Sequence, residues 1–214
     1  MADECARRYT GMIRLGISVE GATEREFVSR VLRRHLADSG VGIVVPIDIG
    51  GNVSLDKIRG VLPAILGQFD FASTMYDLYG FKRRHGRGAD EIEAEVANLV
   101  DEARRARLIP YVQQYEFEAL LFAVPEQTCE WLSLEGSACA AMRAAVAEKG
   151  SPELVNDGVE TSPSHRMRVM FSRYDKKLHG PEILELAGLP AIRAQCPRFD
   201  AWVQSLERLG RRAA

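Results

Sequence analysis

The chain has 214 residues, of which 46% are hydrophobic and 27% charged, and its formal net charge is -2. This composition is too apolar and too evenly charged for a disordered chain, and the length fits one α/β domain with an appended helical part. No apolar run reaches the roughly 18 residues that a membrane-spanning helix needs, and the first residues lack the features of a secretory signal. We therefore expect a cytoplasmic protein that does not associate with membranes.

The cysteines are far apart in the sequence, and no two of them form a C-x-x-C pair. Their spacing predicts neither a zinc site nor a disulfide framework, which is typical of a protein in a reducing compartment. The four residues are Cys5, Cys129, Cys139 and Cys196.

Strands and helices alternate in the first half of the chain, after an expected ragged extension over the first eleven residues. Apolar and polar residues alternate over 13–19, which predicts a strand followed by a glycine turn and a helix. We expect this helix to begin with Thr23 as the N-cap and Glu26 completing a capping box. A second strand is predicted over 43–49, and Pro46 favours an edge position for it.

The same alternation continues with a helix capped by Ser54, a third strand over 69–76, a helix over about 90–107 and a fourth strand over 109–115. This order predicts a mostly parallel sheet with helices on both faces. From residue 125 onward the pattern indicates only helices and loops. We therefore expect an α/β domain over 12–124 and a helical extension over 125–210 that packs on it.

Acidic residues follow three of the predicted strands: Glu20, Asp77, and the pair Glu116 and Glu118. The carboxyl ends of parallel strands meet at one edge of a sheet, so these carboxylates are expected to converge, and Glu24 to point back toward them. Carboxylates in close proximity repel one another and favour sharing a hard divalent cation, Mg²⁺ or Mn²⁺. Glu118 is expected to face solvent instead, because the chain turns helical before it.

Basic residues are candidates for contacts to phosphate. Arg83 and Arg84 lie in a glycine-flanked loop directly after Asp77, where they are placed to steer a phosphate backbone. Lys176 and His179 are further candidates, although His179 is also suited to capping a helix end. The strand-to-helix turn at 50–52, Gly-Gly-Asn, is suited to cradling a phosphate but lacks the lysine of a P-loop.

Several ordered segments carry a resemblance. Residues 19–24, V-E-G-A-T-E, resemble the first motif of Toprim-type catalytic domains, which occur in topoisomerases, primases and nucleases of the overcoming-lysogenisation-defect type. The sequence is more similar still to a bacterial Toprim-related family of unknown function. The shared segments are D-L-Y-G-F at 77–81, E-F-E-A-L-L-F at 116–122, H-G at 179–180 and C-P-R-F at 196–199.

The resemblance implies a Toprim/Rossmann-like three-layer sandwich with a mostly parallel sheet and a C-terminal helical extension. It makes Glu20 and Asp77 the catalytic residues, with Glu20 as metal ligand or general acid/base and Asp77 as the first aspartate of a D-x-D motif. Tyr79 stands where the second aspartate is expected, so Glu116 is the candidate for the missing carboxylate. Tyr115 stands where relatives commonly have histidine. The implied metal ligands are Glu20, Glu24, Asp77 and Glu116.

The function implied is metal-dependent hydrolysis of nucleic acid, with a separately encoded ATPase as partner and a role in defence against phage. The apolar helical half is suited either to covering the sheet or to forming a dimer face, so a homodimer is a candidate assembly. The alternative is a catalytically inactive Toprim-like binding or effector subunit, which the departures at Tyr79 and Tyr115 favour. A carboxylate-pair glycosidase ranks last, because only 7% of the residues are aromatic. The sequence leaves open whether the substrate is DNA or RNA.

Overall fold

The computed structural model describes residues 12–156 and 158–211. The extension expected over the first eleven residues lies outside this part of the chain. No helix of the described residues is long and apolar enough to cross a membrane.

A parallel sheet forms the centre of the molecule, with the strand order β2-β1-β3-β4 and with β5 also paired to β3. The expected α/β fold with a mostly parallel sheet is confirmed, and β2, which contains Pro46, lies at the edge as expected. The strands are β1 (Arg14–Val19), β2 (Ile43–Asp48), β3 (Phe71–Asp77), β4 (Leu108–Ile109) and β5 (Val112–Gln113).

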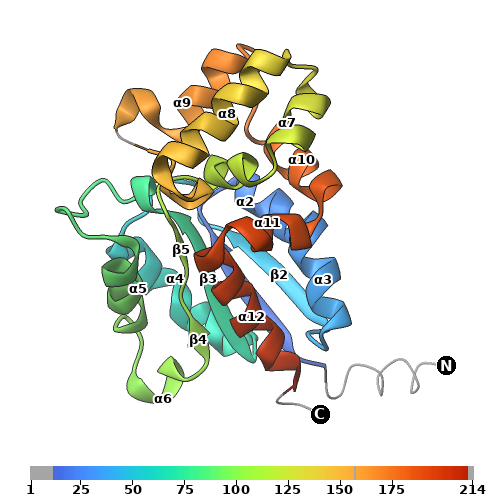
Figure 1. The fold of residues 1–214 in the computed structure, drawn as a ribbon. Helices are drawn as coiled ribbons and strands as arrows, with labels where there is room; N and C mark the ends of the chain where they lie inside the picture. The colour runs from blue at the N-terminus through green and yellow to red at the C-terminus, as the bar shows by residue number, and fades with distance from the viewer. Residues whose placement is uncertain (1–11, 157, 212–214) are drawn as a thin grey trace.

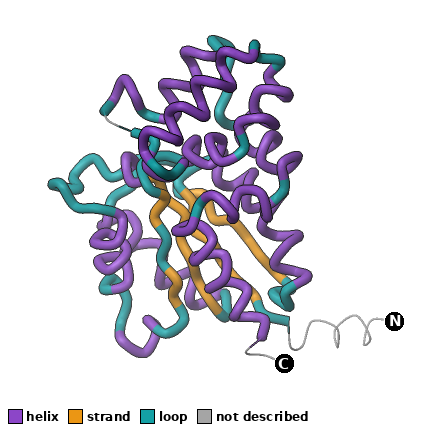
Figure 2. Tube along the Cα trace, in the orientation of Figure 1, coloured by secondary structure: helices purple, strands orange, loops and turns teal. Residues whose placement is uncertain are grey.

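Helices cover both faces of the sheet and make the expected three-layer sandwich (Figures 1 and 2). Two helices, α4 (Leu55–Gln68) and α5 (Ala89–Ala97), pack on one face around a core that includes Tyr76 and Ile92. The opposite face packs against a larger core. Its helices are α2 (Ala22–Phe27), a π-helical turn (Val28–Leu32), α3 (Arg33–Asp38) and α12 (Pro197–Arg211).

The other helices from residue 125 onward lie beyond the carboxyl ends of the strands (Figure 1). The larger core continues from β1 and α2 into these helices, so the two parts of the chain share one apolar interior. The boundary expected at residue 125 stays a prediction. The helices are α7 (Pro125–Leu132), α8 (Gly136–Lys149), α9 (Pro163–Met170), α10 (His179–Ala187) and α11 (Leu189–Gln195). They are preceded by a 3-10 helix (Phe117–Ala123).

The expected N-cap of the first helix is wrong by two residues. The cap is Gly21, and the residue three positions later is Glu24, whose Oε2 accepts a hydrogen bond of 3.0 Å from the Gly21 amide. Thr23 is buried inside the first turn instead. The sequence offers two overlapping capping patterns here, and the one closer to the strand forms.

Two further elements are shorter than expected. The helix predicted over about 90–107 divides into α5 and α6 (Glu102–Arg105), because Asp101 caps a new helix by accepting the Arg104 amide at 2.9 Å. The strand predicted over 109–115 is reduced to β4 and β5, with Pro110 between them. Proline has no amide to donate to the ladder. The Thr74 hydroxyl bridges this gap by bonding the Tyr111 amide and carbonyl, each at 2.8 Å.

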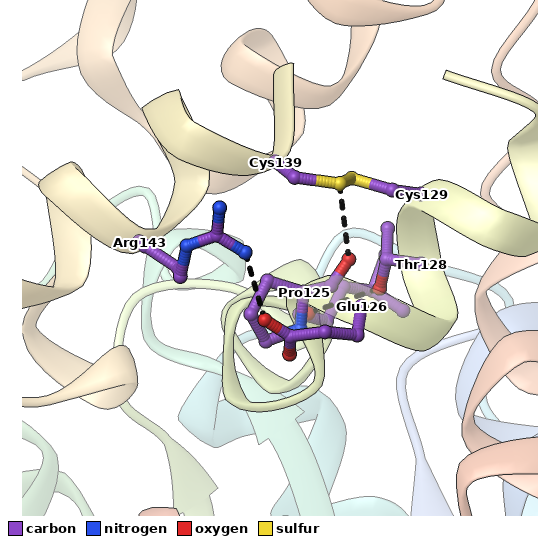
Figure 3. The surroundings of a disulfide bond; sticks show 7 residues. Pro125, Glu126, Thr128, Cys129, Cys139 and Arg143 are labelled. Carbon is purple, nitrogen blue, oxygen red and sulfur yellow. Dashed lines mark hydrogen bonds and ion pairs between the residues drawn. A yellow bond between two sulfur atoms is a disulfide. The ribbon is translucent and has the colours of Figure 1, made fainter. Parts of the chain in front are cut away.

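A disulfide joins Cys129 in α7 to Cys139 in α8, so the expectation that no cysteines pair is wrong (Figure 3). The short turn at Ser133 folds the two helices against each other and brings the two Cα atoms to 6.0 Å, within the range that a disulfide spans. An ion pair of 2.8 Å between Arg143 and Glu126 links the same helices. The pairing depends on this helical hairpin, which cysteine spacing alone does not reveal.

The close approach of α12 to the end of α3 gives a test of the packing. A Cβ at Gly210 would collide with the Ser39 carbonyl, whereas a Cβ at Gly60, inside α4, would meet nothing within 4 Å. We expect Gly210→Ala to destabilise the fold by about 1–3 kcal/mol through overpacking. Gly60→Ala, the matched control, should stabilise it by about 0.5–1 kcal/mol through helix propensity. Urea unfolding measures both, and a Gly210→Ala variant as stable as Gly60→Ala would contradict the packing.

Candidate active site

Glu20 and Asp77 lie where the connections of the sheet diverge. The chain leaves β1 for β2 on one side and then returns to β3 on the other side of β1. Such a switch point is where open α/β sheets bind ligands. Val19 pairs with Met75 across β1 and β3, so Glu20 and Asp77 follow this pair by one and two positions. The structure therefore places both residues at the carboxyl edge of the sheet.

The loops after β2 and β3 hold Glu20 between them. The 3-10 turn after β3 (Leu78–Gly80) approaches so closely that a Cβ at Gly80 would collide with the Glu20 carboxylate. On the other side, the Gly51 amide donates to the Glu20 carbonyl at 2.7 Å. The Lys57 ammonium in turn donates to the Gly51 carbonyl at 2.6 Å. The Glu20 carboxylate thus lies directly against Gly80, a contact that the sequence pattern did not reveal.

Glu24 and Glu118 bring two more carboxylates to the same place. Glu24 is only 2% exposed, and its hydrogen bond from the Gly21 amide folds the carboxylate back over the start of α2, where the charge of Glu20 acts on it. Glu118 is 1% exposed, so the expectation that it faces solvent is wrong. The chain after Glu116 forms a 3-10 helix whose residues are all buried, and this places Glu118 under the helical part of the chain.

Lys176 is the cation among these acids. It comes from the turn before α10, and it acts electrostatically on Glu20, Glu24, Asp77 and Glu118. Burial alone lowers the pKa of Lys176, but the carboxylates around it outweigh that effect and raise the pKa. The ammonium therefore stays charged inside the cluster. Its neighbour Lys177 is exposed, so only one of the two lysines takes part in the cluster.

Burial and mutual repulsion raise the pKa values of all four carboxyls. Burial is the largest cause in each case, and the charge of Lys176 opposes it. The pKa of Asp77 lies well above its ordinary value, because the charges of Glu24, Glu20 and Glu118 add to the effect of burial. Burial raises the pKa of Glu118 to about 7. The cluster therefore holds protons near neutral pH and has an excess of negative charge once they leave.

Three carboxylate oxygens in this cluster have no hydrogen-bond partner among the described residues: Glu20 Oε2, Asp77 Oδ1 and Glu118 Oε1. Buried polar atoms without partners are rare in folded proteins and point to a missing proton or cation. In the described part of the chain, no three His, Cys, Asp or Glu side chains stand as they are in a group that could hold a metal ion. The donor chemistry of these side chains, oxygen only, is the kind that Mg²⁺ and Mn²⁺ prefer.

Glu116 lies at the margin of the cluster and already has a partner. Its Oε2 accepts a hydrogen bond of 3.0 Å from the Ser164 amide in the first turn of α9. Its charge still acts on Glu20 and Glu118. Glu118, not Glu116, is the more deeply buried acid of the E-F-E segment. The only indication of this role in the sequence is that Glu118 lies two residues after Glu116.

Tyr79 and Tyr115, the two departures from the Toprim pattern, pack against each other with ring centroids 5.4 Å apart. The Tyr79 amide donates to the Tyr115 carbonyl at 3.1 Å, and the Tyr79 hydroxyl bonds the Asn156 side chain. Tyr115 has a positive φ of 63°, which is unusual for a bulky residue and typical of functional sites. The Arg84 guanidinium lies over the Tyr79 ring, 5.3 Å from its centroid.

The two remaining phosphate-binding candidates, Arg83 and His179, differ in their surroundings. Arg83 is exposed on the loop after β3 and faces a pocket beside the acids. His179 begins α10, and its Nδ1 accepts a hydrogen bond of 2.9 Å from the Asp175 amide. This bond closes the turn that carries Lys176. His179 therefore helps to position Lys176, and its own connection to the site is through this turn.

Comparisons with known proteins match the chain to one family and to solved structures of similar fold. The family model described as "Domain of unknown function (DUF4276)" matches residues 19–207. No curated protein matches the chain. Among solved structures, the C-terminal region of the Burkholderia pseudomallei OLD protein is similar, with 18% identity, a TM-score of 0.54, and 94% of this chain and 98% of that chain covered.

A second solved structure of similar fold is the C-terminal region of the Xanthomonas campestris pv. campestris OLD protein. It has 18% identity and a TM-score of 0.50, with 94% of this chain and 95% of that chain covered. At this level of identity the likeness establishes a common fold and nothing further.

The raised pKa of Glu118 predicts a pH dependence of stability. The folded state binds the Glu118 proton more tightly than the unfolded chain, where the pKa is near its ordinary value of 4.5. This stabilisation is complete below that value and is lost as the pH rises through about 7. In EDTA, Glu118→Gln should therefore be more stable than wild type at pH 8, by up to about 3 kcal/mol, and similar to it at pH 4.5.

Thermal unfolding across this pH range measures the effect. Glu130→Gln, at an exposed position of α7, is the control and should follow the wild-type profile. Parallel profiles for wild type and Glu118→Gln would contradict the burial of an ionisable carboxyl at this position.

Proposed function

The chain belongs to the family described as Domain of unknown function (DUF4276), and we propose that it is a metal-dependent nuclease that hydrolyses phosphodiester bonds in nucleic acid. The observation that carries the proposal is the group of four carboxylates, Glu20, Glu24, Asp77 and Glu118, gathered with Lys176 at the switch point of a parallel sheet. The fold shared with the C-terminal regions of OLD proteins supports it. The Toprim proteins that the sequence resembles include nucleases of the overcoming-lysogenisation-defect (OLD) type.

The carboxylates are the residues that would hold Mg²⁺ or Mn²⁺. Glu20 and Asp77 each have a buried oxygen free of hydrogen bonds among the described residues, and Glu118 has another. A bound divalent ion would polarise the phosphodiester and lower the pKa of a coordinated water. Glu24 has one oxygen fewer available as a metal ligand, because its Oε2 accepts a hydrogen bond from the Gly21 amide.

Protein side chains supply the other parts of the reaction. Lys176 carries a positive charge inside the cluster, where it is suited to stabilising charge that develops on a phosphate oxygen. Burial raises the pKa of Glu20, so this residue is the candidate for a general acid or base as the alternative to its role as a metal ligand. Arg83 and Arg84, on the loop after β3, would hold the flanking phosphates.

A cytoplasmic location, an ATPase partner supplied by another protein, a role in phage defence and a homodimer belong to this proposal as well. The ATPase partner and the role in defence follow from the Toprim resemblance, the cytoplasmic location from the composition of the chain, and the homodimer from its apolar helical part. The chain itself has no ATPase signature in its sequence.

The second candidate is a binding or effector subunit without catalytic activity. One observation favours it: Tyr79 replaces the second aspartate of the D-x-D motif and is engaged by Asn156, Arg84 and Tyr115. In this candidate the acids and Lys176 are retained at the edge of the sheet, but the site no longer cuts nucleic acid.

Cleavage of supercoiled plasmid, single-stranded DNA and tRNA with Mg²⁺ or Mn²⁺ tests the nuclease proposal. We expect metal-dependent cutting by wild type, and a loss of at least about 100-fold in Glu20→Gln and Asp77→Asn, because both remove charge from the ion-binding group. Glu26→Gln is the matched control: Glu26 lies on the same helix as Glu24 but forms ion pairs with Arg25 and Arg30. Cutting that survives in Glu20→Gln and Asp77→Asn would exclude this site.

A further inference from the structure

A pocket of about 460 Å³ is lined in part by the loops that contact Glu20, although none of the four carboxylates of the cluster lines it. Its walls are the start of α4 and the loop that follows β3. These walls begin one residue away from the two glycines that hold Glu20, since Asn52 follows Gly51 and Phe81 follows Gly80. The pocket therefore opens next to the place where the proposed reaction occurs, at the edge of the sheet where ligands bind.

The pocket combines an apolar floor with a cationic rim. Val53, Phe81 and Ile92 line it and are at most 4% exposed, so they form its floor. Six of the lining residues are exposed: three are basic (Arg59, Lys82 and Arg83), two are neutral and polar (Asn52 and Ser54), and one is acidic (Asp56). An apolar floor accepts a flat base, and a cationic rim accepts a phosphate.

Two of the cations are available to a ligand. No hydrogen bond or ion pair of the described residues engages the side chains of Lys82 and Arg83. Arg59, in contrast, is paired with Asp56 at 2.8 Å. Arg87 is also occupied: it donates to the carbonyls of Arg83 and Arg84, at 2.8 and 2.7 Å, and pairs with Glu95.

Arg87 has a structural role that matters for the pocket. Its bonds to two carbonyls of the loop and to Glu95 on α5 fix the loop after β3, which the flanking glycines alone would leave free. The two unengaged cations, Lys82 and Arg83, are thereby presented from a held backbone. A site with a preformed wall loses less conformational entropy when it binds.

We propose that this pocket binds one unpaired nucleotide of the substrate strand, next to the phosphodiester that Glu20 and Asp77 face. The base lies on the floor formed by Val53, Phe81 and Ile92, and its phosphate meets Lys82 and Arg83. The volume lies in the range of small-molecule sites and suits a single nucleotide. A base inside a duplex cannot enter without being unstacked and unpaired. The substrate class is therefore single-stranded nucleic acid or a strand with an unpaired end, which rests on the proposed nuclease function.

Binding of fluorescein-labelled dT12, a matched duplex and free dTMP in EDTA tests this inference without cutting. We expect dT12 to bind wild type more tightly than the duplex or dTMP. The double variant Lys82→Glu/Arg83→Glu should weaken dT12 binding by about tenfold or more through lost phosphate contacts. Leu55→Trp, which fills the pocket from the first turn of α4, should weaken dT12 binding about fivefold and leave duplex binding within about twofold.

The matched control is Arg104→Glu/Arg105→Glu, the same change of charge on α6, which precedes β4 at the opposite edge of the sheet (Figure 1). It should change dT12 binding by no more than about twofold. If Leu55→Trp does not fold, Arg59→Trp fills the same pocket from an exposed position.

Equal losses in the pocket and control variants, or dT12 binding unchanged by the filled pocket, would overturn the proposal. Equal affinity for dTMP and dT12 would do so as well, because the ligand would then be a free nucleotide. These outcomes are separate from the nuclease test: a protein that cuts but binds normally with the pocket filled has the active site without this subsite.

Discussion

The mutual repulsion of buried carboxylates is the constraint on which the rest of this structure depends. Glu24, Asp77 and Glu118 are at most 6% exposed, and Glu20 lies beside them. Removing such charges from water is costly unless they are protonated, hydrogen-bonded or paired with a cation. Here the ammonium of Lys176 and several backbone amides, among them that of Gly21, partly compensate them. A fold that keeps three of these oxygens without partners retains a site at the expense of stability.

Both halves of the chain are needed to build this site. The sheet contributes Glu20 and Asp77, and the segment after it contributes Glu118. The helical part delivers Lys176 on the turn that His179 closes, and it binds the margin of the site through Ser164 and Asn156. Since the larger core runs through both halves, the position of Lys176 over the strand ends is fixed by packing. The helical part is thus a component of the site as well as a cover.

The sequence predicted the parts of the fold and site that depend on local pattern. The first three strands, the cap at Ser54, and the acids after β1 and β3 follow from alternation, a capping residue and the rule that parallel strands end at one edge. Features set by tertiary contacts were missed. The burial of Glu118 depends on a 3-10 helix packed under the helical part, and the disulfide depends on a helical hairpin. The close contact between Gly80 and the Glu20 carboxylate was missed because it is made between two separate loops.

Calorimetric titration of Mn²⁺ into the protein near pH 6.5, in buffers of different ionisation enthalpy, tests the central claim that these carboxylates form one cation site. We expect micromolar-to-millimolar binding with release of protons. The raised pKa values of the carboxyls mean that they hold protons, which a bound ion displaces. Asp77→Asn should abolish the binding, and Glu118→Gln should reduce the number of protons released. No binding by wild type, or binding that Asp77→Asn leaves unchanged, would contradict it.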